Sequence, residues 1–266
     1  MKFFKNRMKE YEQITQNYLI NRSPVIIRVD GIDFHTFTKG MKRPEYILQD
    51  GIERTAKYLC ENIPGCQLAY VQSDEINLLL TDYETLNTEA WLEYNIQKLT
   101  SVTASMTTMA FEKNFMQAIC DCFPNPMEIE DENQFEHCRI LLEKACVGAA
   151  TFDACAFNLP QTEVCNYFIW RQQVAMRSSL QMFAQSMLPY EELQEKNCSQ
   201  LQKMMFQRCG FNWNDCSISE KRGTCIIKVP QKEGNTTRFS WYIDTNIPIF
   251  TQNREYIDKF VYGRNF

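Results

Sequence analysis

The order of the elements predicted for the first part of the chain constrains the fold more than any other feature of the sequence. A short β-branched run at Pro24–Val29 predicts a strand, and Tyr46–Asn62 carries apolar residues at helical spacing. The elements predicted after them are two strands separated by three residues, a long helix and a last strand, at Gln67–Gln72, Ile76–Thr81, Thr88–Asn114 and Thr151–Leu159. This β-α-β-β-α-β order is that of the ferredoxin-like, split βαβ unit, so it predicts an α+β fold.

The long helix is predicted from one apolar stripe, formed by Leu92, Ile96, Leu99, Val102, Met106 and Met109. The segment Cys120–His137 combines prolines, asparagines and acidic residues with little periodicity, which predicts an exposed loop between two halves of the chain. The second half predicts a long helix, two shorter helical pieces and two strands, at Thr162–Met187, Tyr190–Glu195, Ser199–Cys209, Gly223–Val229 and Arg238–Ile243. An apolar tail follows these elements.

We find no repeat, low-complexity tract or flexible linker, which favours one compact unit over residues 1–266. Within it, the sequence predicts a core over about residues 20–160 and an added helical layer with extra strands over about residues 161–266.

Composition limits the classes of protein to consider. Apolar residues make up 44% of the 266 residues, and no apolar run approaches the roughly 18 residues that a membrane helix needs. The N-terminus has no apolar h-region, so we expect a cytoplasmic protein without membrane contact. The twelve cysteines include no C-x-x-C pair, which indicates core residues rather than a zinc site. A net charge of −5 neither favours nor opposes nucleic-acid binding.

Acidic residues fall at two places that the predicted topology brings together. Asp30 directly follows the first strand, and Asp74 and Glu75 occupy the tip of the hairpin. In the ferredoxin-like sheet the first strand lies beside a hairpin strand, so these carboxylates are expected to meet at one edge. Carboxylates that converge in a low dielectric repel one another unless cations separate them, and Mg²⁺ prefers such hard oxygen ligands. A pair of Mg²⁺ ions can clamp the oxygens of a displacement at phosphorus. The alternative is that each acidic residue only forms a turn.

The residues after Asp30 are suited to a triphosphate. Gly31 lets the backbone approach a ligand closely, and the turn of Ile32, Asp33, Phe34 and His35 can present successive N–H groups to phosphate. Basic side chains that could neutralise further phosphate charge are Lys39, Lys42, Arg43 and, from the long helix, Lys98. Solvated helix and loop positions are the alternative for these side chains.

Seven segments of the chain resemble the tRNA(His) guanylyltransferase family and its Thg1-like relatives. The resemblance runs from about residue 24 to residue 255 and follows the order of the family's motifs. The segments are RVDGIDFHTFTKG, YVQSDEINLLL, NIQKLTSVTASMTTMAF, FDACAFNLP, NYFIWRQQ, KRGTCIIK and DTNIPIF. The motifs D-G-x-x-F-H, S-D-E, F-D-x-x-x-F-x-L-P and W-R-Q-Q carry most of its specificity.

The resemblance implies a polymerase-palm-like core that extends RNA in the 3′-to-5′ direction with two Mg²⁺ ions. Enzymes of this family activate a 5′-monophosphorylated RNA end with ATP or accept a triphosphorylated end. The 3′-hydroxyl of an incoming nucleotide, GTP or another NTP, then attacks that end. Carried over by motif, Asp30, Asp74 and the Gly31 carbonyl bind metal, and the segment Ile32–His35 with Ser73 holds the triphosphate. The remaining positions implied in binding, activation or catalysis are Glu75, Arg28, Arg43 and Lys98.

One segment departs from the pattern of the eukaryotic enzymes. Where they carry H-I-N-N-L-Y-N, this chain has MRSSLQMF at Met176–Phe183. The departure points to a Thg1-like protein that repairs truncated tRNA 5′ ends by copying the opposite strand. The partners so implied are tRNA, nucleoside triphosphates and further copies of the chain in a homotetramer. Guanylate addition to histidine tRNA, a nucleotidyl cyclase-like activity and a non-catalytic tRNA-binding module stay as alternatives.

Overall fold

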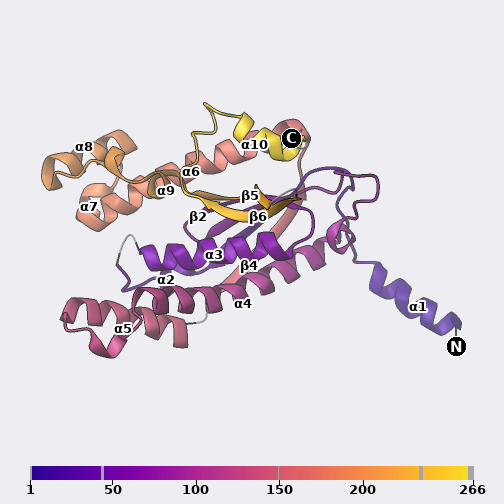
Figure 1. Cartoon of the computed structure of the whole chain (residues 1–266), viewed down its shortest axis with the longest axis horizontal. Helices are drawn as coiled ribbons and strands as arrows, with labels where there is room; N and C mark the ends of the chain where they lie inside the picture. The colour runs from indigo at the N-terminus through magenta and orange to yellow at the C-terminus, as the bar shows by residue number, and fades with distance from the viewer. Residues whose placement is uncertain (1, 43–44, 149, 234–235, 263–266) are drawn as a thin grey trace.

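The computed structural model describes residues 2–42, 45–148, 150–233 and 236–262 and is built around one antiparallel sheet (Figure 1). Among these residues the sheet has six strands in the order β4-β1-β3-β2-β5-β6. The strands are β1 (Val25–Ile32), β2 (Cys66–Gln72), β3 (Glu75–Leu80), β4 (Thr151–Asn158), β5 (Thr224–Glu233) and β6 (Thr236–Asp244). The first four lie in the order 4-1-3-2, which confirms the predicted ferredoxin-like core, and β5 and β6 extend it beyond β2.

The position of β1 decides where the carboxylates of the sequence motifs fall. It pairs on one side with β3, with Val29 opposite Ile76, and on the other side with β4, with Asp30 opposite Asp153. The turn between β2 and β3 is tight, and Ser73 takes a left-handed conformation with φ 53°. Because β1 and β3 are antiparallel, the end of β1 runs past the tip of this hairpin, as predicted.

One face of the sheet is covered by α3 (Tyr46–Asn62) and α4 (Ile96–Cys122). The bounds of α3 agree with its predicted range, and its Ile52, Ala56 and Leu59 are buried against the sheet. Every second residue of a strand points to the same face of the sheet. On this face Ile27, Val29 and Leu78 pack in the same core as the buried residues of α3.

The predicted limits and buried face of the long helix were partly wrong. α4 starts at Ile96, eight residues later than predicted, because Asn95 caps it by accepting a hydrogen bond from the backbone N–H of Lys98 at 3.0 Å. Of the predicted stripe, Val102 and Met109 are exposed. The buried face instead includes two threonines, Thr103 and Thr107, whose hydroxyls donate to backbone carbonyls one turn earlier. Those bonds satisfy the hydroxyls within the core. The buried face was assigned wrongly because these two positions are polar in the sequence.

The loop predicted at Cys120–His137 is also shorter than expected. α4 continues to Cys122, and a further helix, α5 (Glu132–Val147), starts inside the predicted loop. Asp131 caps α5 by accepting from the Gln134 N–H at 2.7 Å. Two of the acidic residues in this segment, Asp131 and Glu132, are thus the cap and the first turn of α5, where negative charge stabilises a helix.

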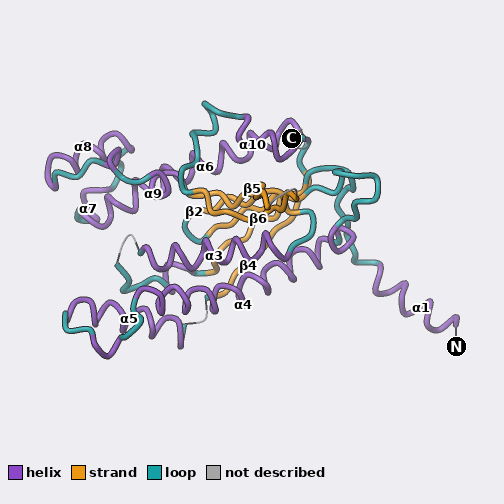
Figure 2. The backbone as a smooth tube through the Cα atoms, viewed as in Figure 1, coloured by secondary structure: helices purple, strands orange, loops and turns teal. Residues whose placement is uncertain are grey.

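The other face of the sheet is covered by α6 (Gln161–Met187) and α10 (Glu255–Val261), as Figures 1 and 2 show. Phe168 of α6 and Ile257 of α10 are buried there with Phe250 of the tail, which packs as predicted. The second half of α6 extends beyond the sheet and builds the expected helical layer with its own small core. The layer contains α7 (Tyr190–Leu193), α8 (Cys198–Cys209) and α9 (Ile218–Arg222).

The N-terminal helix α1 (Lys2–Gln13) projects from this body and buries none of its residues (Figure 1). Within the described part of the chain, no helix combines the length and apolar content that crossing a membrane requires. The interpretation of the cysteines as core residues holds in part. Five are buried, and Cys120, Cys122, Cys146 and Cys209 are exposed.

Candidate active site

The ends of β1 and of the β2–β3 hairpin meet around Gly31. A Cβ atom placed on this glycine would lie 2.8 Å from Asp74 Oδ2 and 2.5 Å from Phe34 Cδ2. Both distances are shorter than real Cβ contacts, so only glycine fits between the carboxylate and the ring. Asp30 precedes Gly31 on the same strand, and its carboxyl is close enough to Asp74 for the two negative charges to interact. The structure thus brings together the three residues predicted to bind metal.

The two aspartates lie in an environment that disfavours negative charge. Burial, followed by the charges of Asp74 and Glu75, raises the pKa of Asp30 from 3.8 to about 6. Burial also raises the pKa of Asp74, against the effect of a hydrogen bond from Ser73. Two partly buried carboxylates with raised pKa values at one sheet edge are typical of sites that bind a cation or transfer protons.

Glu75 is placed differently from Asp74, although the two are neighbours in sequence. Its Oε1 accepts from Arg171 Nε at 2.8 Å and from Asn77 Nδ2 at 2.7 Å, and its Oε2 pairs with Arg171 Nη2. Glu75 is buried at 7% exposure and does not line the cavity described below. Both carboxylate oxygens are therefore engaged within the chain, which favours a role in the electrostatics around Asp30 over direct contact with a substrate. Its catalytic role stays a prediction.

Arg28 lies two residues before Asp30 on the same face of β1, where its charge interacts with Glu75 and Asp30. Its Nε atom is buried, and no described group accepts a hydrogen bond from it. Arg28 thus lies beside the edge of the sheet at Asp30, Gly31 and Asp74, called the carboxylate edge below.

A single helical turn, α2 (Phe34–Phe37), follows β1 directly. Asp33 reverses the chain in a left-handed conformation with φ 50°, and the Phe34 ring anchors the turn against Phe37, Phe111 and Phe152 with centroids 5.1–5.9 Å away. His35 points outward, with 82% of its side chain exposed and Nδ1 at 3.0 Å from Asp33 Oδ1. The His35 imidazole is therefore not buried between the neighbouring Phe34 and Phe37, and it is accessible to a ligand.

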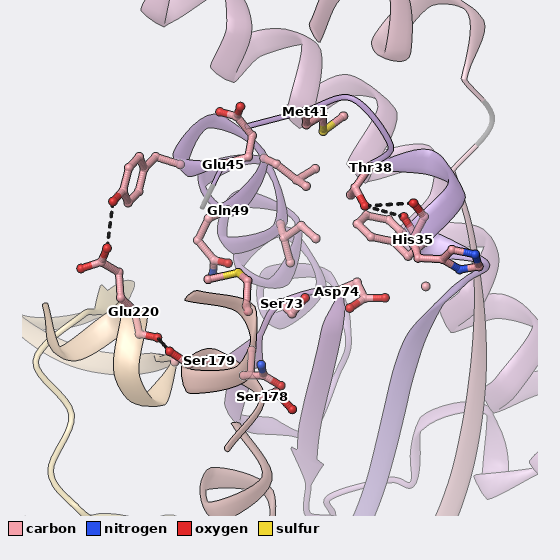
Figure 3. A pocket seen from close by; sticks show the side chains of 18 of the residues that line it. His35, Thr38, Met41, Glu45, Gln49, Ser73, Asp74, Ser178, Ser179 and Glu220 are labelled. Atoms are coloured by element: carbon pink, nitrogen blue, oxygen red, sulfur yellow. Dashed lines mark hydrogen bonds between the residues drawn. The ribbon is translucent and has the colours of Figure 1, made fainter. Parts of the chain in front are cut away.

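A cavity of about 640 Å³ opens at this edge (Figure 3), within the size range of small-molecule sites. Gly31, Asp33–His35, Ser73 and Asp74 line one end. The cavity continues along α3, past Gln49 and Ile52, to the helical layer, where Ser178, Ser179 and Met182 of α6 line it. Ser178 and Ser179 belong to the segment that departs from the eukaryotic motif.

The far wall of the cavity was not predicted from the sequence. There the Tyr46 hydroxyl donates to Glu220 Oε1 at 2.8 Å, and Ser179 Oγ donates to the Glu220 carbonyl at 2.6 Å. Glu45, which caps α3, is paired with His137 Nε2 of α5 at 2.7 Å. Only one signal of this wall was present in the sequence, the S-x-x-E capping box that starts α9 at Ser217.

Some predicted site residues lie elsewhere. Lys98 is exposed in the first turn of α4, whereas the part of α4 that contacts Phe34 is at Phe111, about 20 Å further along the helix axis at 1.5 Å per residue. Lys98 is therefore too far from Asp30 and Asp74 of the same chain to reach them. The prediction that it lies over the same site is wrong. Lys42 lines the cavity, Lys39 is exposed outside its lining, and Arg43 lies outside the described residues.

Comparison with solved structures identifies close structural relatives. A bacterial tRNA(His) guanylyltransferase (Thg1)-like protein in complex with ATP superposes with a TM-score of 0.80 at 39% identity, covering 98% of this chain and 100% of its own. A bacterial Thg1-like protein in complex with GTP matches with a TM-score of 0.76 at 39% identity, covering 98% of this chain and 99% of its own. The similarity therefore includes the core and the helical layer.

Sequence comparison gives the same relationship. The tRNA(His) guanylyltransferase of Debaryomyces hansenii is 26% identical over 83% of this chain and 78% of its own length. The family model for tRNAHis guanylyltransferase, Thg1, matches residues 5–160, more than half of the chain and all four strands of the ferredoxin-like core. With the palm-like sheet, the D-G-x-x-F-H and S-D-E motifs at one edge of it and this match, the chain belongs to the Thg1 family of tRNA(His) guanylyltransferase-like nucleotidyltransferases.

Proposed function

We propose that this protein adds nucleotides to the 5′ end of truncated tRNA in the 3′-to-5′ direction, with the opposite strand as template. The observation that carries the proposal is the cavity that joins Gly31 and Asp74 to the helical layer, with Asp30 directly beside this end but outside its lining. It is large enough for a nucleoside triphosphate, and relatives at 39% identity are described in complex with ATP and with GTP. The departure from H-I-N-N-L-Y-N at Met176–Phe183, which contributes two serines to the cavity wall, favours templated repair over guanylate addition alone.

In this proposal each end of the cavity has its own task. The backbone N–H groups of Ile32–His35 and of Ser73 hold the triphosphate, with the exposed imidazole of His35 and the ammonium of Lys42 as further donors. The base then extends along α3 toward Gln49 and Met182. Arg28 stabilises negative charge beside Asp30, and ATP serves to activate a 5′-monophosphorylated RNA end.

The residues at the carboxylate edge fit divalent cations. Among the described residues no group of three or more His, Cys, Asp or Glu could hold a metal ion. At this edge the chain offers two carboxylates, Asp30 and Asp74, and the Gly31 carbonyl, so substrate phosphates and water would have to complete the coordination. This donor set suits Mg²⁺, which is usually bound by one or two carboxylates together with substrate phosphates and water. Cations here would relieve the repulsion that raises the pKa of Asp30. When bound, two such ions supply charge stabilisation at the phosphorus that is attacked.

We expect Asp30→Asn to stabilise the metal-free protein above pH 6 and to remove its stabilisation by Mg²⁺. Since the folded-state pKa of Asp30 is raised from 3.8 to about 6, its favourable contribution is complete below pH 4 and is lost as the pH rises through 6. Asp30 is only half-buried, so solvent screening reduces the expected gain at pH 8 to about 1 kcal/mol, or roughly 2–4 °C in Tm. Thermal unfolding between pH 4 and pH 8, with and without Mg²⁺, measures both effects.

The matched control is Asp153→Asn, which removes a carboxylate directly opposite Asp30 on β4 that is not one of the proposed metal ligands. This variant should keep the Mg²⁺-dependent rise in Tm. An equal Mg²⁺ response in wild type and Asp30→Asn would contradict metal binding at this edge.

The activity test follows the length and sequence of an RNA. A 5′-truncated, triphosphorylated tRNA is incubated with Mg²⁺ and each NTP in turn, and the base opposite the missing position is changed in four parallel substrates. We expect the nucleotide added to follow the opposite base in all four, because pairing rather than the protein would choose it. A 5′-monophosphorylated substrate should require ATP as well.

The alternatives give other results in the same assay. Addition of guanylate whatever the opposite base would indicate the histidine-tRNA activity. A product formed from NTP without RNA would indicate a cyclase-like enzyme. RNA binding without any lengthening would contradict the proposal and leave a tRNA-binding module.

A further inference from the structure

The side-chain amide of Gln49 lies on the cavity wall between Glu45 and Ser73 (Figure 3). Its Nε2 donates to Glu53 Oε1 at 3.1 Å, one turn further along α3. Glu53 is buried at 9% exposure and does not line the cavity. The carboxyl group therefore holds the amide from behind, and the amide faces the cavity.

This contact fixes which end of the amide a ligand meets. Burial raises the pKa of the Glu53 carboxyl, whereas the hydrogen bond from Gln49 stabilises its charged form. In that charged form the carboxylate only accepts hydrogen bonds, so the NH₂ group of Gln49 points toward Glu53 and its Oε1 points away. No group among the described residues donates to Gln49 Oε1. Gln49 thus presents an unoccupied acceptor to the cavity.

The two neighbouring carboxylates on the same wall already have partners on both oxygens. Glu45 accepts from the Ile47 N–H with one oxygen and pairs with His137 through the other. The carboxylate of Glu220 accepts from the Tyr46 hydroxyl and from the backbone N–H of Ser217. Gln49 therefore offers a ligand an uncharged amide acceptor, between Glu45 and Ser73, that no described residue uses.

We infer that Gln49 Oε1 accepts a hydrogen bond from the exocyclic amino group of a purine base, and that Glu53 is the positioning residue that keeps the amide in this orientation. The inference rests on the proposed function, since a triphosphate at Ile32–His35 and Ser73 directs the base toward Gln49. The apolar side chains of Leu48, Ile52 and Met182 line the same part of the cavity and suit the faces of a purine ring.

Binding of nucleotide pairs that differ by one amino group tests this inference. Dissociation constants are measured by calorimetry, without RNA, for ATP against purine riboside triphosphate and for GTP against inosine triphosphate. In the wild type, at least one amino-bearing member should bind about 10-fold more tightly than its partner, as expected for one hydrogen bond in a partly buried site. The pair that shows the difference identifies adenine or guanine as the base.

Two variants assign the difference to Gln49 and Glu53. Gln49→Leu should weaken the amino-bearing nucleotide about 10-fold and leave its partner unchanged, so that the ratio falls to about 1. Glu53→Gln keeps the shape but can donate or accept, so the Gln49 amide is no longer held in one orientation and the ratio should fall to about threefold. The control is Gln117→Leu, which removes the same kind of bond, Gln117 Nε2 to Asp121 Oδ1 at 2.8 Å, from α4 outside the cavity.

The outcomes separate this inference from the proposed function. A ratio that stays near 10 in Gln49→Leu, or a wild-type ratio of 1 for both pairs in a protein that still extends tRNA, overturns only the inference. A ratio that Glu53→Gln leaves unchanged removes Glu53 from it. A wild type that binds none of the four nucleotides overturns the inference and the proposed function together.

Discussion

Asp74→Asn is expected to lower the rate of nucleotide addition about 10²- to 10³-fold without unfolding the protein. The Asp74 carboxylate lines the cavity, and its Oδ2 lies over Gly31, where we propose that metal and phosphate meet. Removing its charge leaves the site with the Asp30 carboxylate alone, and the loss of one preorganised group that stabilises transition-state charge costs about this factor. The measurement is the single-turnover rate on triphosphorylated, truncated tRNA at saturating NTP.

The structural cost of this change should be small or even favourable. Burial raises the pKa of Asp74, so the charged form is disfavoured in the folded protein and an uncharged side chain of the same size removes that cost. Thermal unfolding should therefore give a Tm no lower than that of the wild type. Asp153→Asn serves as the control and should keep the rate within about threefold, because it changes charge near Asp30 without changing the cavity. Equal losses in the two variants would show a general electrostatic effect and contradict the role proposed for Asp74.

The first half of the fold was predictable because its elements repeat simple periods. β1, α3, β2 and β3 follow from β-branched runs, a helical apolar spacing and a short turn, which are local signals. The turn was predicted with three residues but has two, Ser73 and Asp74, because Glu75 pairs with Gln72 as the first residue of β3. The meeting of Asp30 with Asp74 then follows from topology, since antiparallel neighbours bring the end of one strand to the tip of the next hairpin.

The predictions that were wrong fall where local polarity conflicts with burial. Thr103 and Thr107 are polar in sequence but satisfied by backbone carbonyls in the core, so the buried face of α4 was assigned to Val102 and Met109 instead. The acidic start of α5 was interpreted as a loop for a similar reason. In a sequence, polar residues that cap a helix or donate to its backbone carbonyls look the same as the polar residues of a loop. Only the structure separates the two cases.

The far wall of the cavity could not be predicted because its contacts are distant in sequence. Tyr46 meets Glu220 across 174 residues, and this contact requires α6 and α9 to fold back over the edge of the sheet. No periodicity in either segment encodes that approach. The sequence therefore indicated the end of the cavity proposed to hold phosphate, whereas the end proposed to hold the base required the structure.

We expect Gly31→Ala to lower the rate of nucleotide addition about 10²-fold and to destabilise the protein by about 1–3 kcal/mol. The new methyl group would lie 2.5 Å from Phe34 Cδ2 and 2.8 Å from Asp74 Oδ2, so one of the two side chains must move. Phe34 is buried against Phe37, Phe111 and Phe152, and its displacement costs the energy of an overpacked core. Asp74 can turn more easily, but a shift of about 1 Å in a group of the active site is enough for the loss of rate.

A double variant separates the two displacements. In Gly31→Ala/Phe34→Leu the smaller side chain makes room for the methyl group beside residue 34, while the approach to Asp74 Oδ2 is unchanged. Relative to Phe34→Leu alone, the alanine should then cost less stability, and the rate should stay low because the carboxylate is still displaced.

Gly40→Ala is the control for glycine replacement in the same segment. It meets no atom within 4 Å and has φ 89°, so it should cost about 1 kcal/mol through backbone strain and leave the rate unchanged. Full activity in Gly31→Ala would mean that nothing reactive occupies the space above Gly31, and the carboxylate edge would then lose its place in the mechanism.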